Sequence, residues 1–275
     1  MKPFTIASLS ICLAFASAGR TYSAADDIVF ASVASLHQNG LNGAIVKGTK
    51  PANTGDWPAT LYAQVEPGSH CTATIVGPQA VLLAAHCVPS KGTFSIVVDQ
   101  VTFHARCTIA PGWLKDESDD YAMCAVDGQP FPVPAESIST TIEAVKVGTQ
   151  LLIAGFGCND QYQNGSGTFR IGHAPVVRLP NVKDANYVFD KNSVVTQGSQ
   201  SICPGDSGGG AYLETQSATG THRVIVAVNS RVDLSKLTSY LSSMATPDAV
   251  GFLNNWMQTN NQKICGLGAQ NGCRN

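Results

Sequence analysis

Short hydrophobic runs separated by turn residues recur along the chain from Ile45 onward. The runs are rich in Val, Ile, Leu and Thr, and Gly, Pro, Asn or Asp residues lie between them. This pattern predicts short β-strands joined by turns. The segments expected to form strands are 72–76, 80–84, 94–103, 122–126, 150–154 and 224–228.

One segment near the C-terminus has a different period. Val250, Leu253, Trp256 and Met257 recur at helical spacing within residues 247–257, which predicts an amphipathic helix. Many short strands with a single terminal helix favour an all-β barrel or sandwich. The sequence contains no internal repeat and no low-complexity linker.

Composition and charge exclude several classes of protein. The 275 residues include 17 basic and 19 acidic side chains, so the net charge is −2. Because no block of basic residues is present, we expect no nucleic-acid partner. Charged residues make up only 13% of the chain, about half the usual share. The 44% hydrophobic content is enough for a core and excludes a wholly disordered chain.

The N-terminus has the layout of a secretory signal. Lys2 precedes an apolar stretch, residues 4–18, whose end carries small residues at Ala16 and Ala18. We expect a signal peptide over residues 1–18, with cleavage after Ala24 as the alternative. The stretch is shorter than the ~20 residues that span a bilayer, so no membrane association is expected after processing. The protein should be secreted, outside the cell or into a periplasm, and its composition is typical of a bacterial extracellular enzyme.

The cysteine count supports export. Of nine cysteines, Cys12 lies in the expected signal peptide, and the remaining eight predict four disulfides in an oxidising compartment. No metal site is expected, because the chain has no Cys-x-x-Cys pair and its two His-Cys pairs are adjacent residues, which chelate poorly. The eight are Cys71, Cys87, Cys107, Cys124, Cys158, Cys203, Cys265 and Cys273.

The segment Cys203-Pro-Gly-Asp-Ser-Gly-Gly-Gly210 carries the most chemical information. Its glycines allow positive φ and a close approach of substrate to the backbone, and a serine there lies beside backbone N–H groups that suit an oxyanion. A serine nucleophile needs a base and a group that orients the base. His86 ends one apolar strand, and Asp120 precedes another, with Asp119 as its local alternative. Taken singly, each residue also fits a structural role, but the three together indicate catalysis.

The quoted residues carry a family resemblance. The stretches Cys71-Thr-Ala-Thr-Ile-Val, Ala-Ala-His86-Cys87, Asp120-Tyr-Ala and Gly205-Asp-Ser207-Gly-Gly, in this order, resemble the chymotrypsin/trypsin-like serine endopeptidases over residues 45–275. The resemblance implies two six-stranded antiparallel β-barrels with an active site between them, acting on protein or peptide substrates. It implies that Ser207 is the nucleophile, His86 the general base and Asp120 the acid that orients it. The N–H groups of Gly205 and Ser207 would form the oxyanion hole. Nothing in the sequence requires a cofactor, a metal or an oligomer, so we expect a monomer.

The segment Ile45-Val46-Lys47-Gly48 resembles the activated N-terminus of that family. The resemblance implies a propeptide over residues 19–44, a protease domain over 45–275, and an ion pair between the new α-amino group of Ile45 and Asp206. Ala44 stands where tryptic zymogens carry Arg or Lys. We therefore expect an activating protease that prefers small residues, or autocatalysis.

Specificity is also read from the resemblance. Ser201, six residues before Ser207, would lie at the base of the specificity pocket, and Asn229 stands where a glycine usually forms its wall. A neutral base predicts cleavage after medium or small apolar residues rather than after Arg or Lys. Ala227 falls where a serine usually supports the catalytic aspartate, so we expect one hydrogen bond fewer at Asp120.

The resemblance also implies disulfide pairings. Cys71–Cys87 and Cys107–Cys124 are expected in the first half of the domain. Cys158–Cys203 and Cys265–Cys273 are expected in the second half, although these four residues allow other connectivities.

Two other functions compete with an active protease. A catalytically silent member of the family could act as a binding or adhesion module; the intact His86, Asp120 and Ser207 count against it, and Ala227 and Asn229 count for it. An esterase with a Ser-His-Asp triad on another fold would need α/β alternation and its histidine last in the chain. Here His86 precedes Ser207, and no such alternation is present.

Overall fold

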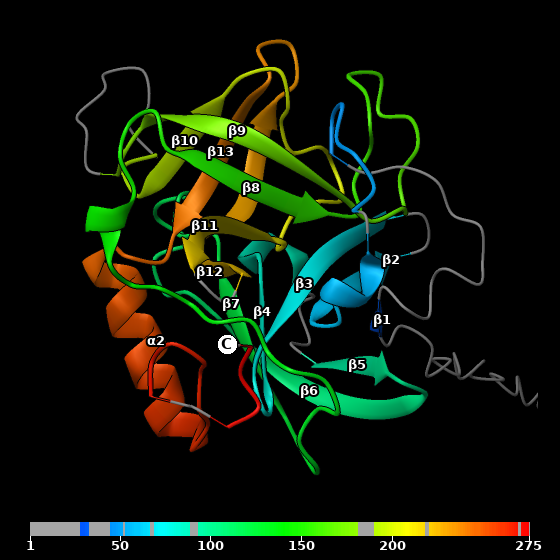
Figure 1. The fold of residues 1–275 in the computed structure, drawn as a ribbon. Coiled ribbons are helices and arrows are strands. Elements are labelled where there is room, and N and C mark those ends of the chain that lie inside the picture. Colours follow the sequence, from blue (N-terminus) through cyan, green and yellow to red (C-terminus); the bar gives the residue numbers. More distant parts are fainter. Residues whose placement is uncertain are drawn as a thin grey trace, which may run out of the picture.

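A computed structural model describes residues 28–32 (backbone), 45–51, 53–66, 69–88, 93–180, 190–217, 220–268 and 271–274. Two β-barrels lie one above the other in Figure 1, and a single long helix lies along one side of the molecule. The expected signal peptide and most of the expected propeptide fall outside the described residues.

The first barrel contains six antiparallel strands in the order β2-β3-β4-β7-β6-β5. A further strand, β1 (Ile28–Ser32), lies between β2 and β5 and closes this barrel. The six strands are β2 (Thr60–Glu66), β3 (Ser69–Gly77), β4 (Ala80–Leu83), β5 (Thr93–Val98), β6 (Val101–Ile109) and β7 (Ala122–Val126).

The second barrel also contains six antiparallel strands, in the closed order β10-β13-β12-β11-β8-β9. The predicted architecture of two six-stranded barrels with a C-terminal helix is thus confirmed, with β1 as an addition that the sequence did not reveal. The strands are β8 (Gln150–Gly155), β9 (Arg170–Arg178), β10 (Ser193–Gln197), β11 (Gly210–Ser217), β12 (Gly220–Asp233) and β13 (Thr238–Ser243).

One predicted strand is in fact a hairpin. The run 94–103, expected as a single strand, is divided into β5 and β6 by Asp99 and Gln100, whose φ values are 47° and 68°. Two consecutive residues with positive φ form the tight turn that matches the twist of a hairpin. The usual Asn-Gly or Asp-Gly signal is missing here, so the sequence pattern did not show the turn.

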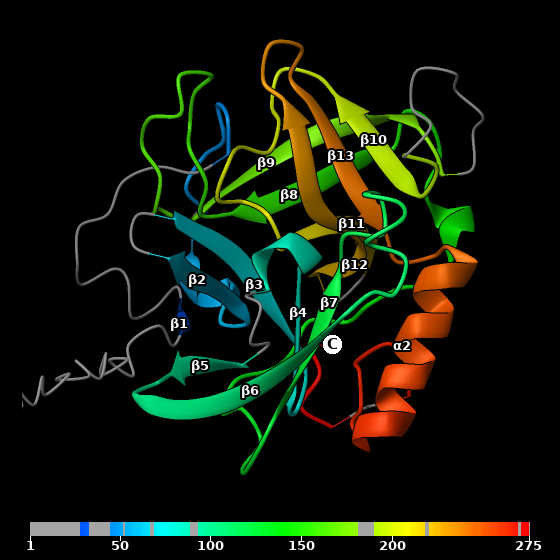
Figure 2. The same ribbon diagram turned by 180° about the vertical axis from the view of Figure 1, so that it is seen from behind.

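The helix α2 (Pro247–Asn260) begins where the sequence predicts it. The Thr246 side chain accepts a hydrogen bond from the N–H of Ala249, and Pro247 occupies the first turn, where no N–H is needed. The face toward the barrels contains Ala249, Phe252, Leu253 and Trp256. Figure 2 shows the helix from the other side, beside the first barrel. The described residues also form three short 3-10 helices, η2 (Thr54–Asp56), η3 (Ala85–Cys87) and η4 (Ile142–Ala144).

A buried ion pair fixes the connection between the barrels. The carboxylate of Glu136, only 1% exposed, lies in the segment between β7 and β8 and accepts bonds of 3.2 Å from Nε of Arg223 on β12. The guanidinium of Arg223 also stacks over the ring of Trp57, 3.4 Å from its centroid. Since Trp57 lies shortly before β2, one cation joins three separate parts of the chain.

Candidate active site

The residues predicted to act together come from both barrels. His86 lies in η3, just after β4, and Asp120 lies two residues before the start of β7 in the same barrel. Ser207 lies in the loop between β10 and β11 of the second barrel. The structure brings all three to the junction of the barrels.

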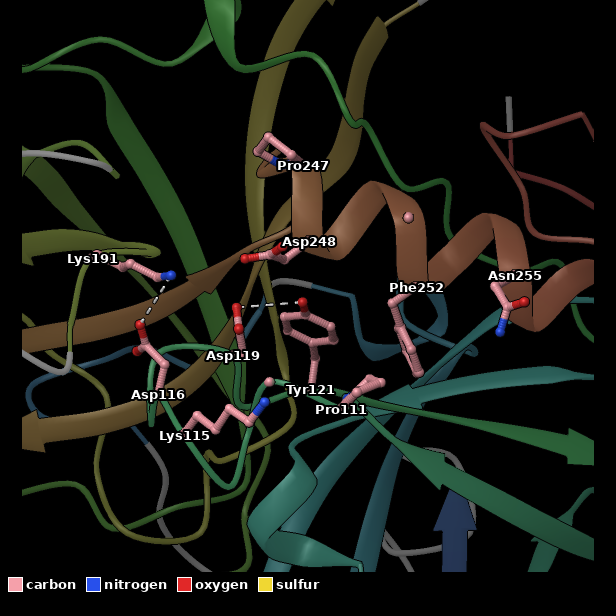
Figure 3. Close-up of a pocket in the computed structure, with 12 residues that line it drawn as sticks. Pro111, Lys115, Asp116, Asp119, Tyr121, Lys191, Pro247, Asp248, Phe252 and Asn255 are labelled. Carbon is pink, nitrogen blue, oxygen red and sulfur yellow. Dashed lines mark hydrogen bonds and ion pairs between the residues drawn. The ribbon is translucent and has the colours of Figure 1, made fainter.

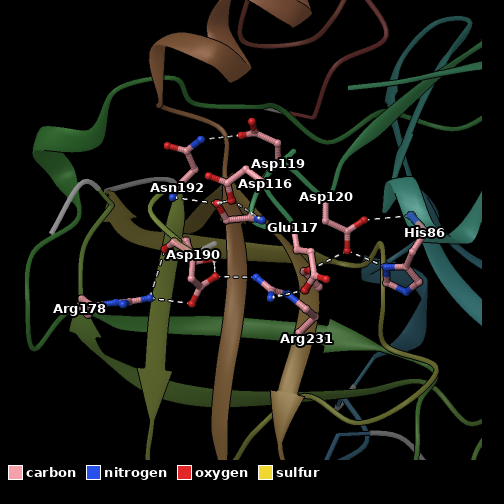
Figure 4. A network of polar contacts seen from close by, with 12 residues as sticks. His86, Asp116, Glu117, Asp119, Asp120, Arg178, Asp190, Asn192 and Arg231 are labelled. Atoms are coloured by element: carbon pink, nitrogen blue, oxygen red, sulfur yellow. Dashed lines mark hydrogen bonds and ion pairs between the residues drawn. The ribbon is translucent and has the colours of Figure 1, made fainter. Parts of the chain in front are cut away.

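Asp120 holds the ring of His86. Its Oδ2 lies 2.6 Å from Nδ1 of His86, and its Oδ1 accepts the backbone N–H of His86 at 3.0 Å (Figure 4). Because an ionised carboxylate only accepts hydrogen bonds, Nδ1 carries the proton and Nε2 is left as the basic nitrogen. Asp120 is fully buried, whereas the side chain of His86 is 35% exposed. Asp119, the local alternative, instead bonds to Asn192 and Tyr121.

Ser230 supplies the hydrogen bond that was expected to be missing. Its hydroxyl donates to Oδ2 of Asp120 at 2.6 Å, across the junction of the barrels. The expectation that Ala227 leaves Asp120 with one bond fewer is therefore wrong. Ser230 lies at a register irregularity of β12 against β13, between Asn229 and Arg231, the kind of site where a bulge redirects a side chain.

The loop that carries Ser207 is anchored to the first barrel. The carbonyl of Ser207 accepts the N–H of Thr72 at 2.7 Å, and the Thr72 hydroxyl donates to the carbonyl of Gly205 at 2.9 Å. Gly208 has a φ of +84°, and a Cβ there would lie 2.3 Å from the Thr72 carbonyl, so this position requires glycine. The Ser207 hydroxyl donates to the carbonyl of Ser230 at 3.4 Å.

The backbone N–H groups of Gly205 and Ser207 are available to a ligand. Within the part of the chain that the structure describes, neither donates to a protein acceptor. Gly205 has a φ of +101°, a conformation that side-chain-bearing residues rarely adopt. Two N–H groups beside a serine hydroxyl form the arrangement that stabilises an oxyanion.

Asp206 is fully buried beneath this loop. Its Oδ1 accepts the N–H of Gly157 at 2.7 Å and its Oδ2 accepts the N–H of Cys203 at 2.8 Å. The backbone N–H of Ile45, itself fully buried, also bonds to this carboxyl. Burial raises the pKa of Asp206 to about 7, although the three hydrogen bonds act in the opposite direction. Glycine at 157 makes room, because a Cβ there would lie 2.7 Å from the carboxyl carbon.

The two expected pocket residues differ in their positions. Ser201 is fully buried, its carbonyl accepts the N–H of Val46 at 3.0 Å, and its hydroxyl has no protein partner among the described residues. Asn229 is also fully buried, but its Nδ2 donates to the carbonyl of Ala154 at 3.0 Å. Its backbone pairs with Gly208 and Gly209. The expectation that Asn229 narrows a pocket is therefore wrong, because its side chain holds β12 against β8.

Comparison with known families agrees with this geometry. The sequence profile described as Trypsin matches residues 46–240, which contain His86, Asp120 and Ser207. The chain belongs to the trypsin family. It is accordingly a trypsin-like serine protease in general terms, with protein substrates.

All four disulfides of this trypsin-family chain join the cysteines that the sequence analysis paired. They are Cys71–Cys87, Cys107–Cys124, Cys158–Cys203 and Cys265–Cys273. Among the described residues, no helix has the length and hydrophobicity to cross a membrane.

The trypsin-family domain has a pocket of about 510 Å³ between residues 111–119 and the start of α2 (Figure 3). Asp119 in its wall accepts hydrogen bonds from Nδ2 of Asn192 at 2.7 Å and from the Tyr121 hydroxyl at 3.4 Å. Burial, with the nearby carboxylates of Asp116 and Asp248, raises the pKa of Asp119. The residues that line this pocket do not include Ser207 or its loop.

A polar network extends from this region across the second barrel. Asp190 accepts Nη2 of Arg178 at 2.8 Å and also pairs with Arg231, which follows Ser230 on β12 (Figure 4). The other side of Arg231 contacts the exposed Glu117 at 3.0 Å. None of these residues was singled out in the sequence, because pairing between distant loops leaves no local pattern.

Proposed function

We propose that this chain is a secreted serine endopeptidase that hydrolyses peptide bonds with Ser207, His86 and Asp120. The observation that carries the proposal is the Asp120 carboxylate, which is buried and holds Nδ1 of His86 at 2.6 Å while accepting the Ser230 hydroxyl. A carboxylate in this position fixes one tautomer of the imidazole and stabilises its cation.

The proposed reaction has two halves. The Ser207 hydroxyl rotates from the Ser230 carbonyl toward His86, attacks the scissile carbonyl and transfers its proton to Nε2. The N–H groups of Gly205 and Ser207 stabilise the resulting oxyanion. His86 then donates the proton to the leaving amine, and the peptide C–N bond breaks. A water molecule attacks the acyl-enzyme by the same route and restores the Ser207 hydroxyl.

We propose that cleavage before Ile45 activates the enzyme, by an external protease that accepts Ala44 or by autocatalysis. In the uncut chain Ile45 has a φ of 53°, which is strained for a β-branched residue. Cleavage removes the preceding carbonyl and with it part of that strain. It also creates an ammonium group beside the buried carboxyl of Asp206, where an ion pair offsets the cost of burying the charge.

The neutral side chain of Ser201, the residue expected at the base of the specificity pocket, supports a non-tryptic preference. Ser201 offers a neutral hydroxyl without a protein partner, so it lacks the negative charge that would select a basic side chain. We propose that medium or small apolar residues precede the cleaved bond. Four disulfides are consistent with secretion, and we propose that the enzyme acts as a monomer.

A fluorophosphonate that labels activated serines tests the proposal. The intact mass of the secreted protein should correspond to a chain that begins at Ile45, and it should rise by one adduct after labelling. Ser207→Ala should abolish the adduct. A correctly processed chain that does not react would contradict the protease and favour the silent binding module, whose Ser207 hydroxyl stays on the Ser230 carbonyl.

A further inference from the structure

The strand β1 (Ile28–Ser32) lies within the expected propeptide and yet forms part of the first barrel. It pairs antiparallel with β2 from Val29↔Gln64 to Ser32↔Leu61. On its other side it pairs parallel with β5 from Ile28↔Phe94 to Ala31↔Val97. Either expected signal cleavage, after residue 18 or after residue 24, leaves this strand in the precursor.

The barrel depends on this strand for its closure. Among the described strands, β2 and β5 do not pair with each other, and β1 is the element between them. Without it, two edges would expose unpaired backbone N–H and C=O groups, an arrangement that folded proteins avoid. The groove between β2 and β5 therefore fits one extended polypeptide strand.

Cleavage before Ile45 changes how this strand is held. The twelve residues from 33 to 44 connect β1 to Ile45, and Ile45 is buried in the core of the second barrel. After the cut, the attachment that the structure describes for residues 28–32 is their backbone pairing with β2 and β5. When a peptide adds to the edge of a sheet, it forms backbone hydrogen bonds along one of its own edges. The strand β1 forms them along both edges.

We propose that β1 stays in the first barrel after activation, so that the mature enzyme is a non-covalent complex of its catalytic domain and its own propeptide. This inference rests on the proposed cleavage before Ile45. The covalent link of the precursor brings the strand into place at high effective concentration, and the cut then leaves a bound peptide. The propeptide is thus a structural subunit of the enzyme and not only a segment to be removed.

Native mass spectrometry tests the proposal on a Ser207→Ala protein in which residues 40–44 are replaced by the recognition sequence of a site-specific protease. After cleavage and desalting in native buffer, we expect one species with the summed mass of domain and propeptide, which separates only under denaturing conditions. Phe30→Pro removes a backbone N–H inside the doubly paired strand and should release the peptide. Leu36→Pro, between β1 and the cut, should not.

If the Phe30→Pro chain does not fold, a second measurement still tests the proposal. An isotopically labelled synthetic peptide of residues 25–39 should exchange into the cut Ser207→Ala protein that keeps Phe30. The same peptide with proline at position 30 should compete for this site at least about tenfold more weakly. Loss of the propeptide from a domain that stays folded would overturn the proposal, as would equal competition by both peptides. Because the cut is engineered and Ser207 is absent, these results do not depend on catalysis or on natural processing.

Discussion

Asp206→Asn should have opposite consequences for the uncut and the cleaved chain. In the uncut chain the carboxyl has a pKa of about 7 against an ordinary value of 3.8, which corresponds to a penalty of about 4 kcal/mol once both states are ionised. Asparagine removes this penalty. However, its amide must face the N–H of Gly157 or Cys203, and a buried unsatisfied donor costs about 1–3 kcal/mol. The uncut chain should therefore keep its stability or gain slightly.

The cleaved chain should lose stability with the same substitution. Its Ile45 ammonium would be left in the core without a partner, and breaking a buried ion pair from one side costs about 3–5 kcal/mol. The free energy of unfolding of the cleaved form should thus fall by at least about 3 kcal/mol more than that of the uncut form. Cleaved Asp206→Asn protein should also react poorly with the fluorophosphonate.

The free energies of unfolding of the uncut and the cleaved chain can be measured in Ser207→Ala protein. The method is urea unfolding followed by tryptophan fluorescence, with the disulfides intact. Asp127→Asn is a suitable control, because its side chain is 61% exposed and should affect both forms equally, by less than about 1 kcal/mol. Equal losses in the two forms for Asp206→Asn would refute the ion pair.

The pH dependence has a defined sign in each form. For the uncut chain the raised pKa means that Asp206 favours the folded state most below the ordinary carboxyl pKa, and this contribution is lost as the pH rises toward 7. For the cleaved chain the ion pair raises the pKa of the α-amino group above its ordinary value near ~8. Stability and activity should then fall together at alkaline pH as the ammonium loses its proton.

Three further substitutions, one of them with a surface control, test individual contacts. Ser230→Ala removes a buried donor from the active-site carboxylate and should lower kcat about tenfold with little change in KM, measured on a peptide ester. Glu136→Gln breaks the buried pair with Arg223 and should lower the free energy of unfolding by about 3–5 kcal/mol, whereas Glu117→Gln on the surface should cost less than about 1 kcal/mol. Asp119→Asn should raise Tm at neutral pH, because burial raises the pKa of Asp119, and the gain should vanish at a pH below the ordinary carboxyl pKa; a loss at neutral pH would contradict this assignment.

Local motifs in the sequence carried the family resemblance, and that resemblance implied the two barrels and the disulfide pairings that the structure contains. Of the expected catalytic residues, the structure shows His86 and Asp120 in direct contact. Glycine-rich loops, strand-end acids and cysteine spacing are short-range signals, so they can be recognised without knowing which strands pair. The roles of Ala227 and Asn229 were misjudged because they were assigned by position along the chain, whereas the residue that contacts Asp120 is Ser230, three positions after Ala227. Ser230 could have been found only by comparing all the polar residues of that strand.

Long-range pairing could not be read from the chain. The strand β1 has an ordinary β-type sequence, and nothing local shows that its partners are β2 and β5. The pair of Glu136 and Arg223 joins residues 87 positions apart, so neither residue marks the other. The turn at Asp99 and Gln100 lacks glycine, and hydrophobic periodicity therefore continued across it.

None of the four disulfides joins one barrel to the other. Cys71–Cys87 and Cys107–Cys124 lie in the first barrel, Cys158–Cys203 lies in the second, and Cys265–Cys273 closes a short loop after α2. The Asp120 carboxylate and the Ser230 hydroxyl nevertheless belong to different barrels. Oxidation thus makes each half durable without fixing the halves to each other. The alignment of Asp120 with the second barrel therefore depends on non-covalent contacts, such as the Ser230 hydrogen bond and the hydrophobic core that the barrels share.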